Sequence, residues 1–508
     1  MASDNKNNFA SDCEILAIPI WRAGEEDKEP YANLMGITGY FQYYEDILWP
    51  SYGGSLTLLD VSLNIISDMP IRGFEKVVVQ VKDVNGNQYD YKFRVWSVIN
   101  RVVLERRQAY TLNLISEEGL VNEGLRVNNV RKGPVSTVVT KLMKEFFKAD
   151  MFVTGTDENN VDGGTWWENY HGIIDKTANN IKVIPTKKTP FALIRSIQTK
   201  TIPDKIPTAD EIAFNNSGIV LENQYNEDER REMGLITDET LLEASHVGDD
   251  VEKAGKTAGY YFFQTRKGFN FRSIDTLAGG EPVNIKTPFK WSAGRVGGND
   301  SLWKIQEIQY GEEINILKKM REGAYSSLIC FFNINTGKYT ERLYSIKDTW
   351  DEMTHIGKDT NLPSGLATLS TRPSRIMSTV INHENWNMGE GIADSTDEES
   401  DGTFEYPDEQ MNYLSQSYAR AGIMMINQLT ISVTGHLELV AGDLVEVRVP
   451  NQRDDKAREK NPWDSQYSGT YLIKKLNHQF DISHQTVYTV LELIRDSCGI
   501  KYPDEQTI

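Results

Sequence analysis

The chain has 508 residues, more than one ordinary hydrophobic core accommodates, and this length predicts two to four domains. Hydrophobic residues make up 39% of it and aromatic residues 10%, so folded domains are expected rather than disorder. Its 73 acidic and 54 basic residues give a net charge of −19, which argues against a free DNA-binding protein because such a surface repels nucleic acid.

Cysteine usage and the N-terminus narrow the class further. Cys13, Cys330 and Cys498 lie far apart without CxxC spacing, which argues against a disulfide scaffold or a cysteine zinc site. Met1 to Asp12 is polar and lacks the apolar run of a secretory signal. No apolar stretch reaches the roughly 18 residues of a membrane span, so we expect no membrane insertion. These features predict a soluble protein made in a cytoplasm.

The N-terminal quarter is predicted to be mostly β-structure. Residues 76–81 and 89–95 alternate apolar and polar side chains, and Asn85-Gly86 between them favours a tight hairpin. Residues 110–115 alternate again, and Ser116 to Gly119 ends that strand.

The middle of the chain mixes helices and hairpins. Apolar residues at helical spacing predict a helix over 134–147, with Pro134 in its first turn, and Thr189 is expected to cap a helix through Ile197. The remaining expectations follow in chain order: a charged, solvated loop at 226–232, an aromatic hairpin over 259–274, a helix over 312–322 ended by Gly323, a hairpin around 335–337, an exposed acidic loop over 384–405, and a helix from Asp408 leading into a strand at 429–433.

The C-terminal end predicts three strands. Residues 444–449 and 471–480 flank a charged insertion at 451–468, and 487–494 follow after a polar turn. In the last strand, Tyr488 and Ile494 are expected on one face and Leu491 and Leu493 on the other, with both faces covered. The sequence YTVLELIR from Tyr488 also echoes YTLNLIS from Tyr110, which suggests that one barrel-like unit occurs twice.

Catalytic and binding motifs mostly fail when tested on this chain. Gly255-Lys256-Thr257 suggests a phosphate loop, but Asp250 stands where the pattern needs glycine and no strand precedes it. His478 and His484 flank the last turn, where histidines are more often structural than metal ligands. No HExxH or GxSxG motif occurs, and no two carboxylates stand out as a glycosidase pair. We therefore predict no catalytic, cofactor-binding or metal-binding residues.

One acidic segment approaches the spacing of a calcium loop. Asp397, Asp401 and Asp408 occupy positions where such a loop places ligands, and Gly402 stands at its glycine. However, Asp408 reaches less far than the usual glutamate, and Pro407 removes a backbone donor. A solvated acidic loop is the favoured interpretation, and calcium binding is the alternative.

Four segments together carry a family resemblance. These are YYEDILWPSYGGSLTLLDVSLNIISDMPIRGFEKVVVQV from Tyr43, SEEGLVNEGLRV at 116–127, GYYFFQTRKGFNFRSIDTL from Gly259, and the closing GDLVEVRVP, SGTYLIKKLNHQFD and YTVLELIRDS. In this order they resemble the baseplate central hub protein of contractile-tailed, T-even-like bacteriophages. This sequence departs from the family pattern in the stretches 384–405 and 451–468. It is also longer than the smallest family members.

The resemblance implies a β-rich α+β fold. Two tail-tube-like antiparallel β-barrel domains, 1–127 and 291–508, would flank an inserted α+β domain at 128–290. The second barrel would carry helical and loop additions. Because the resembled hub is structural, no catalytic residue is carried over from it.

The resemblance also implies a mechanical role and a set of partners. The chain would form a homotrimer that joins the sixfold tail tube to the threefold central spike, since two similar domains per chain make a pseudo-hexamer. Baseplate wedge proteins and the tape-measure protein would be further partners, with DNA only in transit during genome ejection. The location would be the virion tail baseplate, assembled in the host bacterial cytoplasm. The alternatives are a tail-associated cell-wall hydrolase and a related secretion-system spike hub.

Overall fold

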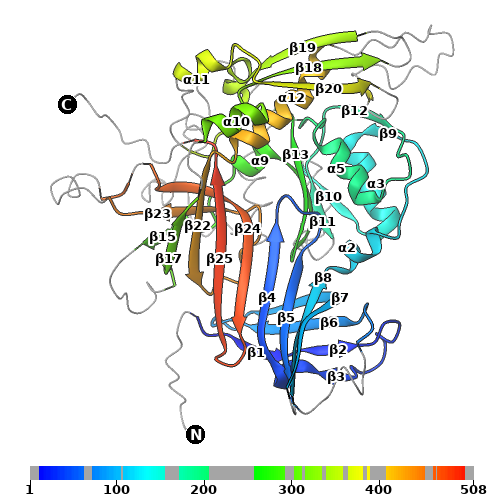
Figure 1. Cartoon of the computed structure of the whole chain (residues 1–508), viewed down its shortest axis with the longest axis vertical. Coiled ribbons are helices and arrows are strands. Elements are labelled where there is room, and N and C mark those ends of the chain that lie inside the picture. Colours follow the sequence, from blue (N-terminus) through cyan, green and yellow to red (C-terminus); the bar gives the residue numbers. More distant parts are fainter. Residues whose placement is uncertain are drawn as a thin grey trace.

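One large sheet connects the two ends of the chain (Figure 1). The computed structural model describes residues 11–61, 71–104, 107–154, 171–204, 257–291, 302–311, 315–333, 339–357, 364–381, 386–388, 408–451, 462–464 and 466–497. Of the described strands, 15 belong to this sheet. They are β1 (Glu14–Ala17), β2 (Pro19–Trp21), β3 (Ala32–Asn33), β4 (Thr38–Asp46), β5 (Gly53–Asp60), β6 (Lys76–Lys82), β7 (Gln88–Leu104), β8 (Arg107–Ile115), β15 (Phe289–Trp291), β16 (Lys304–Ile305), β17 (Glu307–Tyr310), β22 (Asn427–Thr434), β23 (Leu444–Arg448), β24 (Gly469–Asp481) and β25 (Thr486–Arg495).

The main path of this sheet runs β16-β15-β23-β24-β4-β5-β8-β7-β6-β2-β3. Beside this path, β1 pairs with β6, β25 pairs with β24 and β22, and β17 pairs with β22. The fold class predicted from the sequence, β-rich α+β with antiparallel sheets, is confirmed. The strands expected in two separate barrels belong instead to this one sheet, and no closed barrel is detected among the described strands.

The strands form where apolar side chains recur at every second residue. In β6 and β7 the buried residues Val77, Val79, Phe93 and Val95 alternate with more exposed ones, and Gly86 takes a φ of +93° in the turn between these strands. The predicted hairpin is therefore confirmed. However, β7 continues to Leu104, well past the expected end at Val95.

Three smaller sheets complete the β-structure. Their strand orders are β10 (Met151–Val153), β11 (Gly172–Ile174), β14 (Gly268–Ser273), β13 (Tyr260–Thr265); β21 (Trp386–Met388), β12 (Asn180–Val183), β9 (Arg131–Pro134); and β19 (Tyr339–Ser345), β18 (Ser326–Asn333), β20 (Arg375–Ile381). The aromatic hairpin and the β18–β19 hairpin were predicted. The strand β21 corrects the expected loop at 384–405, because Trp386–Met388 pairs with β12.

Most of the described α-helices pack against these smaller sheets, whereas the first of them packs against β7 of the large sheet (Figure 1). They are α2 (Glu117–Asn122), α3 (Val135–Phe147), α5 (Pro190–Gln198), α9 (Ile274–Ala278), α10 (Ile316–Glu322), α11 (Ser364–Leu369) and α12 (Asp408–Ile423). In α5 the Thr189 side chain accepts the Ala192 N–H, as predicted. Helix α10 begins later than expected, after the cap Asn315, and ends at Gly323 with a φ of +78°.

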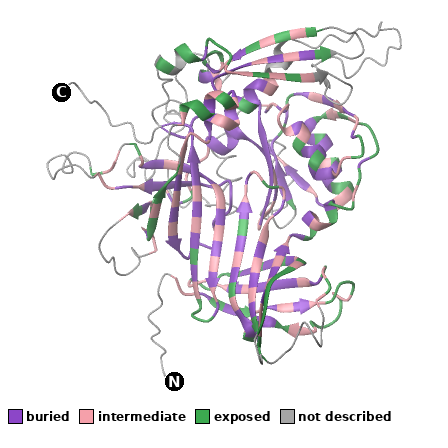
Figure 2. Cartoon of the chain, in the orientation of Figure 1, coloured by how far each residue is buried: buried purple, intermediate pink, exposed green. Residues whose placement is uncertain are grey.

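The largest core lies between strands from the two ends of the chain, and Figure 2 shows these strands alternating buried and exposed residues. Phe41 of β4 stacks on Phe480 of β24 with 5.2 Å between ring centroids. The closing strand β25 lies between β22 and β24, as expected for a strand at a sheet centre. However, Tyr488 is 42% exposed, so the expectation that both faces are covered is wrong at that end.

Candidate functional site

The large sheet contains the same five-stranded unit twice. In the first unit the chain makes β4, β5, β6, β7 and β8 in turn, and their spatial order is β4-β5-β8-β7-β6. In the second unit the chain makes β17, β22, β23, β24 and β25, and their spatial order is β17-β22-β25-β24-β23. All these pairings are antiparallel. Numbered by their order in the chain, the strands of both units therefore lie in the same spatial order, 1-2-5-4-3.

An irregularity recurs at the same place in both copies. In β7 the register shifts between Val95 and Ser97, directly after the strand passes from its partner β6 to its partner β8. In β24 the register shifts between Ile473 and Lys475, directly after the passage from β23 to β25. A β-bulge bends its strand locally. Trp96 and Lys474 are thus equivalent residues. Beyond them β7 shifts register once more, between Ile99 and Val102, and β24 does not, so equivalent residues there are matched through their partners in β8 and β25.

This correspondence refines the echo seen in the sequence. Leu112 and Leu114 of β8 are equivalent to Leu491 and Leu493 of β25, and all four are buried. The two tyrosines that opened the echo are not equivalent: Tyr110 is 1% exposed and Tyr488 is 42% exposed. The extra residue in YTVLELIR shifts its start by one position, and in a strand this moves a side chain to the other face.

A second echo was missed by sequence reasoning. The cross-strand registers make Phe41-Gln42-Tyr43 of β4 equivalent to Ile308-Gln309-Tyr310 of β17. The signal consists of two identical residues in three, too short to find without the strand pairing.

The two units join where β4 pairs with the C-terminal half of β24. Phe41 lies opposite Phe480, and Tyr43 lies opposite His478 with stacked rings 5.9 Å apart. The His478 Nδ1–H donates to the Thr489 hydroxyl at 2.8 Å, and that hydroxyl donates to the Gly435 carbonyl. Burial, together with the charge of Arg266, lowers the pKa of His478 to about 3.

A buried carboxylate fastens this junction to the rest of the molecule. Glu45 of β4 accepts the Tyr43 hydroxyl at 2.6 Å, the Arg266 backbone N–H at 2.6 Å and the Ala441 backbone N–H at 2.7 Å. Burial raises the pKa of Glu45 above its ordinary value, and the three donors oppose that shift. The carboxylate thus connects the first unit, the β13–β14 turn and the chain entering β23.

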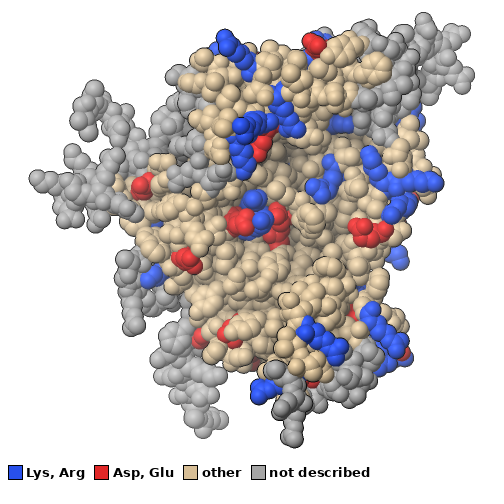
Figure 3. All heavy atoms as spheres, in the orientation of Figure 1, with Lys and Arg blue, Asp and Glu red and all other residues tan. Residues whose placement is uncertain are grey.

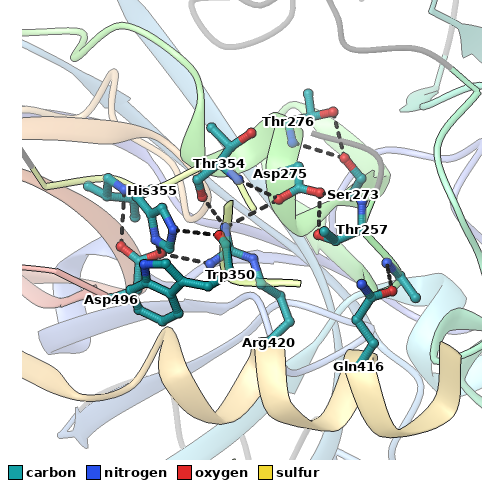
Figure 4. Close-up of polar contacts among 12 residues, drawn as sticks. Thr257, Ser273, Asp275, Thr276, Trp350, Thr354, His355, Gln416, Arg420 and Asp496 are labelled. Atoms are coloured by element: carbon teal, nitrogen blue, oxygen red, sulfur yellow. Dashed lines mark hydrogen bonds and ion pairs between the residues drawn. The ribbon is translucent and has the colours of Figure 1, made fainter. Parts of the chain in front are cut away.

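Above the junction, a second buried network is centred on Arg420 of α12 (Figure 4). Its guanidinium donates to Asp496 at 2.7 Å and to the Thr354 carbonyl, and lies 3.3 Å from Asp275. His355 Nδ1 lies 2.9 Å from the same Asp496 carboxylate. Burial opposes ionisation of Asp496, but His355 and Arg420 outweigh it and hold the pKa of this carboxyl well below its usual range.

The same network holds the chain on either side of the β13–β14 hairpin. Asp275 of α9 accepts the backbone N–H of Thr257 at 2.9 Å and of Thr354 at 3.1 Å. Gln416 of α12 accepts the Ala258 N–H at 3.0 Å. Because the side chains of Arg420, Asp496 and Asp275 are sealed from solvent, the network fixes α9, α12 and the end of β25 in place and offers a substrate no entry.

The residues weighed for chemistry in the sequence are not brought together. His478 is bound to Thr489, whereas the exposed His484 has its own partner Asp481 at 2.8 Å. Within the described ranges no group of metal-ligating side chains gathers. The segments 226–232 and 250–256, and the aspartates 397 and 401 of the calcium pattern, lie outside the described residues, while Asp408 begins α12. No described helix is long and apolar enough to cross a membrane.

The sequence matches no family model and no curated protein. The structure resembles a tail protein from Neisseria meningitidis MC58 (11% identity, 94% of this chain and 96% of that one, TM-score 0.46). It also resembles the 43 kDa tail protein of prophage MuSo2 from Shewanella oneidensis (9% identity, 94% of this chain and 98% of that one, TM-score 0.45).

A third similar structure comes from a secretion system. The E. coli c3393 protein is a component of the type VI secretion system with structural similarity to the T4 bacteriophage tail proteins gp27 and gp5; it shares 8% identity, covers 96% of this chain over 77% of its own length, and gives a TM-score of 0.37. By description, these three similar structures are two tail proteins and one component of a secretion system. The likeness is distant and concerns the fold alone.

Proposed function

We propose that this chain is a structural baseplate hub of a phage tail, a trimeric adaptor between a sixfold tail tube and a threefold central spike. The observation that carries the proposal is the duplicated unit: one chain contains two copies of the same five-stranded arrangement in one continuous sheet. Three chains would present six such units, so a threefold assembly could offer each of six tube subunits a similar surface.

The buried networks support a role in transmitting force. Glu45 and Arg420 each connect elements from distant parts of the sequence through buried, charge-assisted hydrogen bonds. Such bonds hold a fixed geometry because each lost partner would leave a buried charge unpaired. An adaptor that transmits force between two rings requires this kind of rigidity.

The division into domains 1–127, 128–290 and 291–508 remains part of the proposal. Strands β9 to β14 form sheets separate from the large one, which suits an inserted domain. The large sheet itself draws strands from both proposed tube-like domains, which would make them a single body rather than two independent modules.

The proposed partners are further copies of this chain, the tail-tube, central spike, baseplate wedge and tape-measure proteins, and DNA only in transit. On the face drawn in Figure 3, acidic and basic side chains of the described residues are interspersed over a largely uncharged surface. This face therefore presents no continuous acidic patch among the described residues. If an acidic channel wall weakly repels the passing DNA, another face of the molecule has to form it.

The mass of the full chain in solution tests the proposal. Light scattering over a wide concentration range should give three copies, and averaged end-on images should show six lobes with threefold repetition. Six copies of this chain in the ring of an assembled tail would overturn the symmetry match. The alternative of a cell-wall hydrolase is tested separately: purified protein should not clear peptidoglycan, and clearing abolished by one carboxylate substitution would replace the proposal.

A further inference from the structure

The internal repeat leaves two strand edges without their counterparts. In the second unit, the C-terminal half of β24 carries β25 on one edge and β4 on the other. The equivalent half of β7 carries β8 on one edge. Its other edge has no partner among the described strands, because the pairing with β6 ends at Arg94. Likewise β17, the equivalent of β4, pairs on one edge with β22 and with no described strand on the other.

Equivalent residues of β24 and β7 differ in solvent exposure, as expected if β7 lacks the neighbouring strand that β24 has in β4. Leu476 and Phe480 of β24, covered by β4, are each 1% exposed. Their equivalents in β7 are Val98 and Val103, and these apolar residues are 38% and 66% exposed. A long apolar strand edge left open is a site for pairing with another chain.

We propose that β17 of one copy of this chain pairs antiparallel with β7 of the next copy, repeating the internal β4–β24 junction between copies. The register follows from the internal one. Because Phe41 lies opposite Phe480 and Gln42 opposite Gln479, Ile308 of one copy lies opposite Val103 of its neighbour, and Gln309 opposite Val102.

This pairing is head to tail, because the two edges lie at opposite sides of the sheet (Figure 1). A head-to-tail contact closes into a ring if its rotation allows, and otherwise grows a filament. Closure after three copies rests on the proposed function. Each ring would then contain six units joined by two alternating versions of one junction, three within chains and three between them.

Disulfide trapping tests the register. In a background with Cys330→Ser and Cys498→Ser, the full chain carrying both Ile308→Cys and Val103→Cys should oxidise to a covalent trimer, since opposed residues bring Cβ atoms within disulfide reach. Each single variant should stay uncrosslinked. The matched control pairs Glu307→Cys with Val103→Cys, which places one thiol on the opposite sheet face and should crosslink far less.

A charge at the same edge gives the second measurement. Val103→Asp should weaken self-association at least about 100-fold in light scattering, because pairing would bury an unpaired carboxylate. The control Ile376→Asp changes an apolar residue that is 71% exposed on β20, the edge strand of a separate sheet, and should keep the wild-type mass.

The outcomes separate this inference from the proposed function. A trimer that neither crosslinks at these positions nor responds to Val103→Asp overturns the strand pairing but keeps the trimeric adaptor. Crosslinked ladders that pass three copies support the pairing and overturn the trimer. A chain that stays monomeric and uncrosslinked at every concentration overturns the pairing as a property of the chain itself.

Discussion

Glu45 accepts the backbone N–H of Ala441 at 2.7 Å, although 396 residues separate the two in sequence. The carboxylate is buried, and its other oxygen receives the Tyr43 hydroxyl and the Arg266 N–H. One side chain therefore serves three donors from three distant segments. The stability of the junction between the two units should depend on it strongly.

Replacing this carboxylate should be costly. Glu45→Ala leaves a hydroxyl and two backbone N–H groups buried without an acceptor, and we expect a loss of about 3–5 kcal/mol in the free energy of unfolding. Urea denaturation measures it. The control Glu25→Ala removes a solvent-exposed ion pair with Lys28 and should leave the free energy of unfolding close to that of wild type. Equal free energies of unfolding for the two variants would show that Glu45 does not stabilise the junction.

The Arg420 network should be equally sensitive to losing its cation. Arg420→Met removes the guanidinium that pairs with the buried carboxylates of Asp496 and Asp275, and we expect about 3–5 kcal/mol of destabilisation. A double-mutant cycle with Asp496→Asn should give a large coupling energy, because the second change removes one orphaned charge. Lys347→Met, at an exposed position, is the control. Additive effects would mean that the Arg420–Asp496 pair is not energetically coupled.

His478 should make stability depend on pH. Its pKa is about 3 in the folded chain and about 6.5 when unfolded, so below pH 6.5 the unfolded chain binds a proton that the folded chain does not. Stability is therefore lost as pH falls from 6.5 towards 3, by up to about 1.4 kcal/mol per pH unit from this residue.

Denaturation of His478→Asn at several pH values measures this contribution. The slope of unfolding free energy against pH should become shallower between pH values of about 6 and 4. Ser483→Ala should keep the wild-type slope, because Ser483 is exposed in the adjacent turn and carries no titratable group. An unchanged slope in His478→Asn would mean that the buried imidazole titrates normally.

Strand β25, which closes the chain, should tolerate substitutions on one of its two faces only. Leu491 is fully buried between Ile431 and Leu476, and Leu491→Asp should cost several kcal/mol and give insoluble or unassembled protein. Tyr488→Thr, on the half-exposed face of the same strand, should change the free energy of unfolding by less than about 1 kcal/mol. Recovery of soluble protein and its mass check both. Soluble, assembled Leu491→Asp protein would contradict the position of β25 in the sheet.

Local patterns predicted most elements but not how they come together. The alternation in residues 89–95 and the caps at Thr189 and Gly323 act between near neighbours, so the sequence displays them directly. The β4–β24 junction depends on pairing between distant strands, for which no local signal exists. The sequence predicts a loop at Trp386–Met388, because only the pairing with β12 makes this segment a strand.

The two buried networks escaped the sequence for the same reason. Asp275 and Asp496 each follow a predicted strand or hairpin, where a carboxylate normally faces solvent. Nothing near them in sequence supplies the cation. Arg420 comes from the predicted helix α12, and only the folded arrangement brings all three together.

The β4–β24 pairing can form only late in the synthesis of the chain. The ribosome completes β4 early, but Lys475 to Asp481, which pair with it, emerge only near the end of the chain. At roughly 5–20 residues per second, the outer edge of β4 waits about 20–90 s for its partner. During that interval the nascent first unit leaves the edge of β4 that β24 will cover without a partner, and the open edge of β7, the equivalent of β24, is available in earlier, finished copies. Correct maturation therefore requires that the chain's own C-terminus outcompete its neighbours for β4, and high expression rates should favour strand-exchanged aggregates over finished chains.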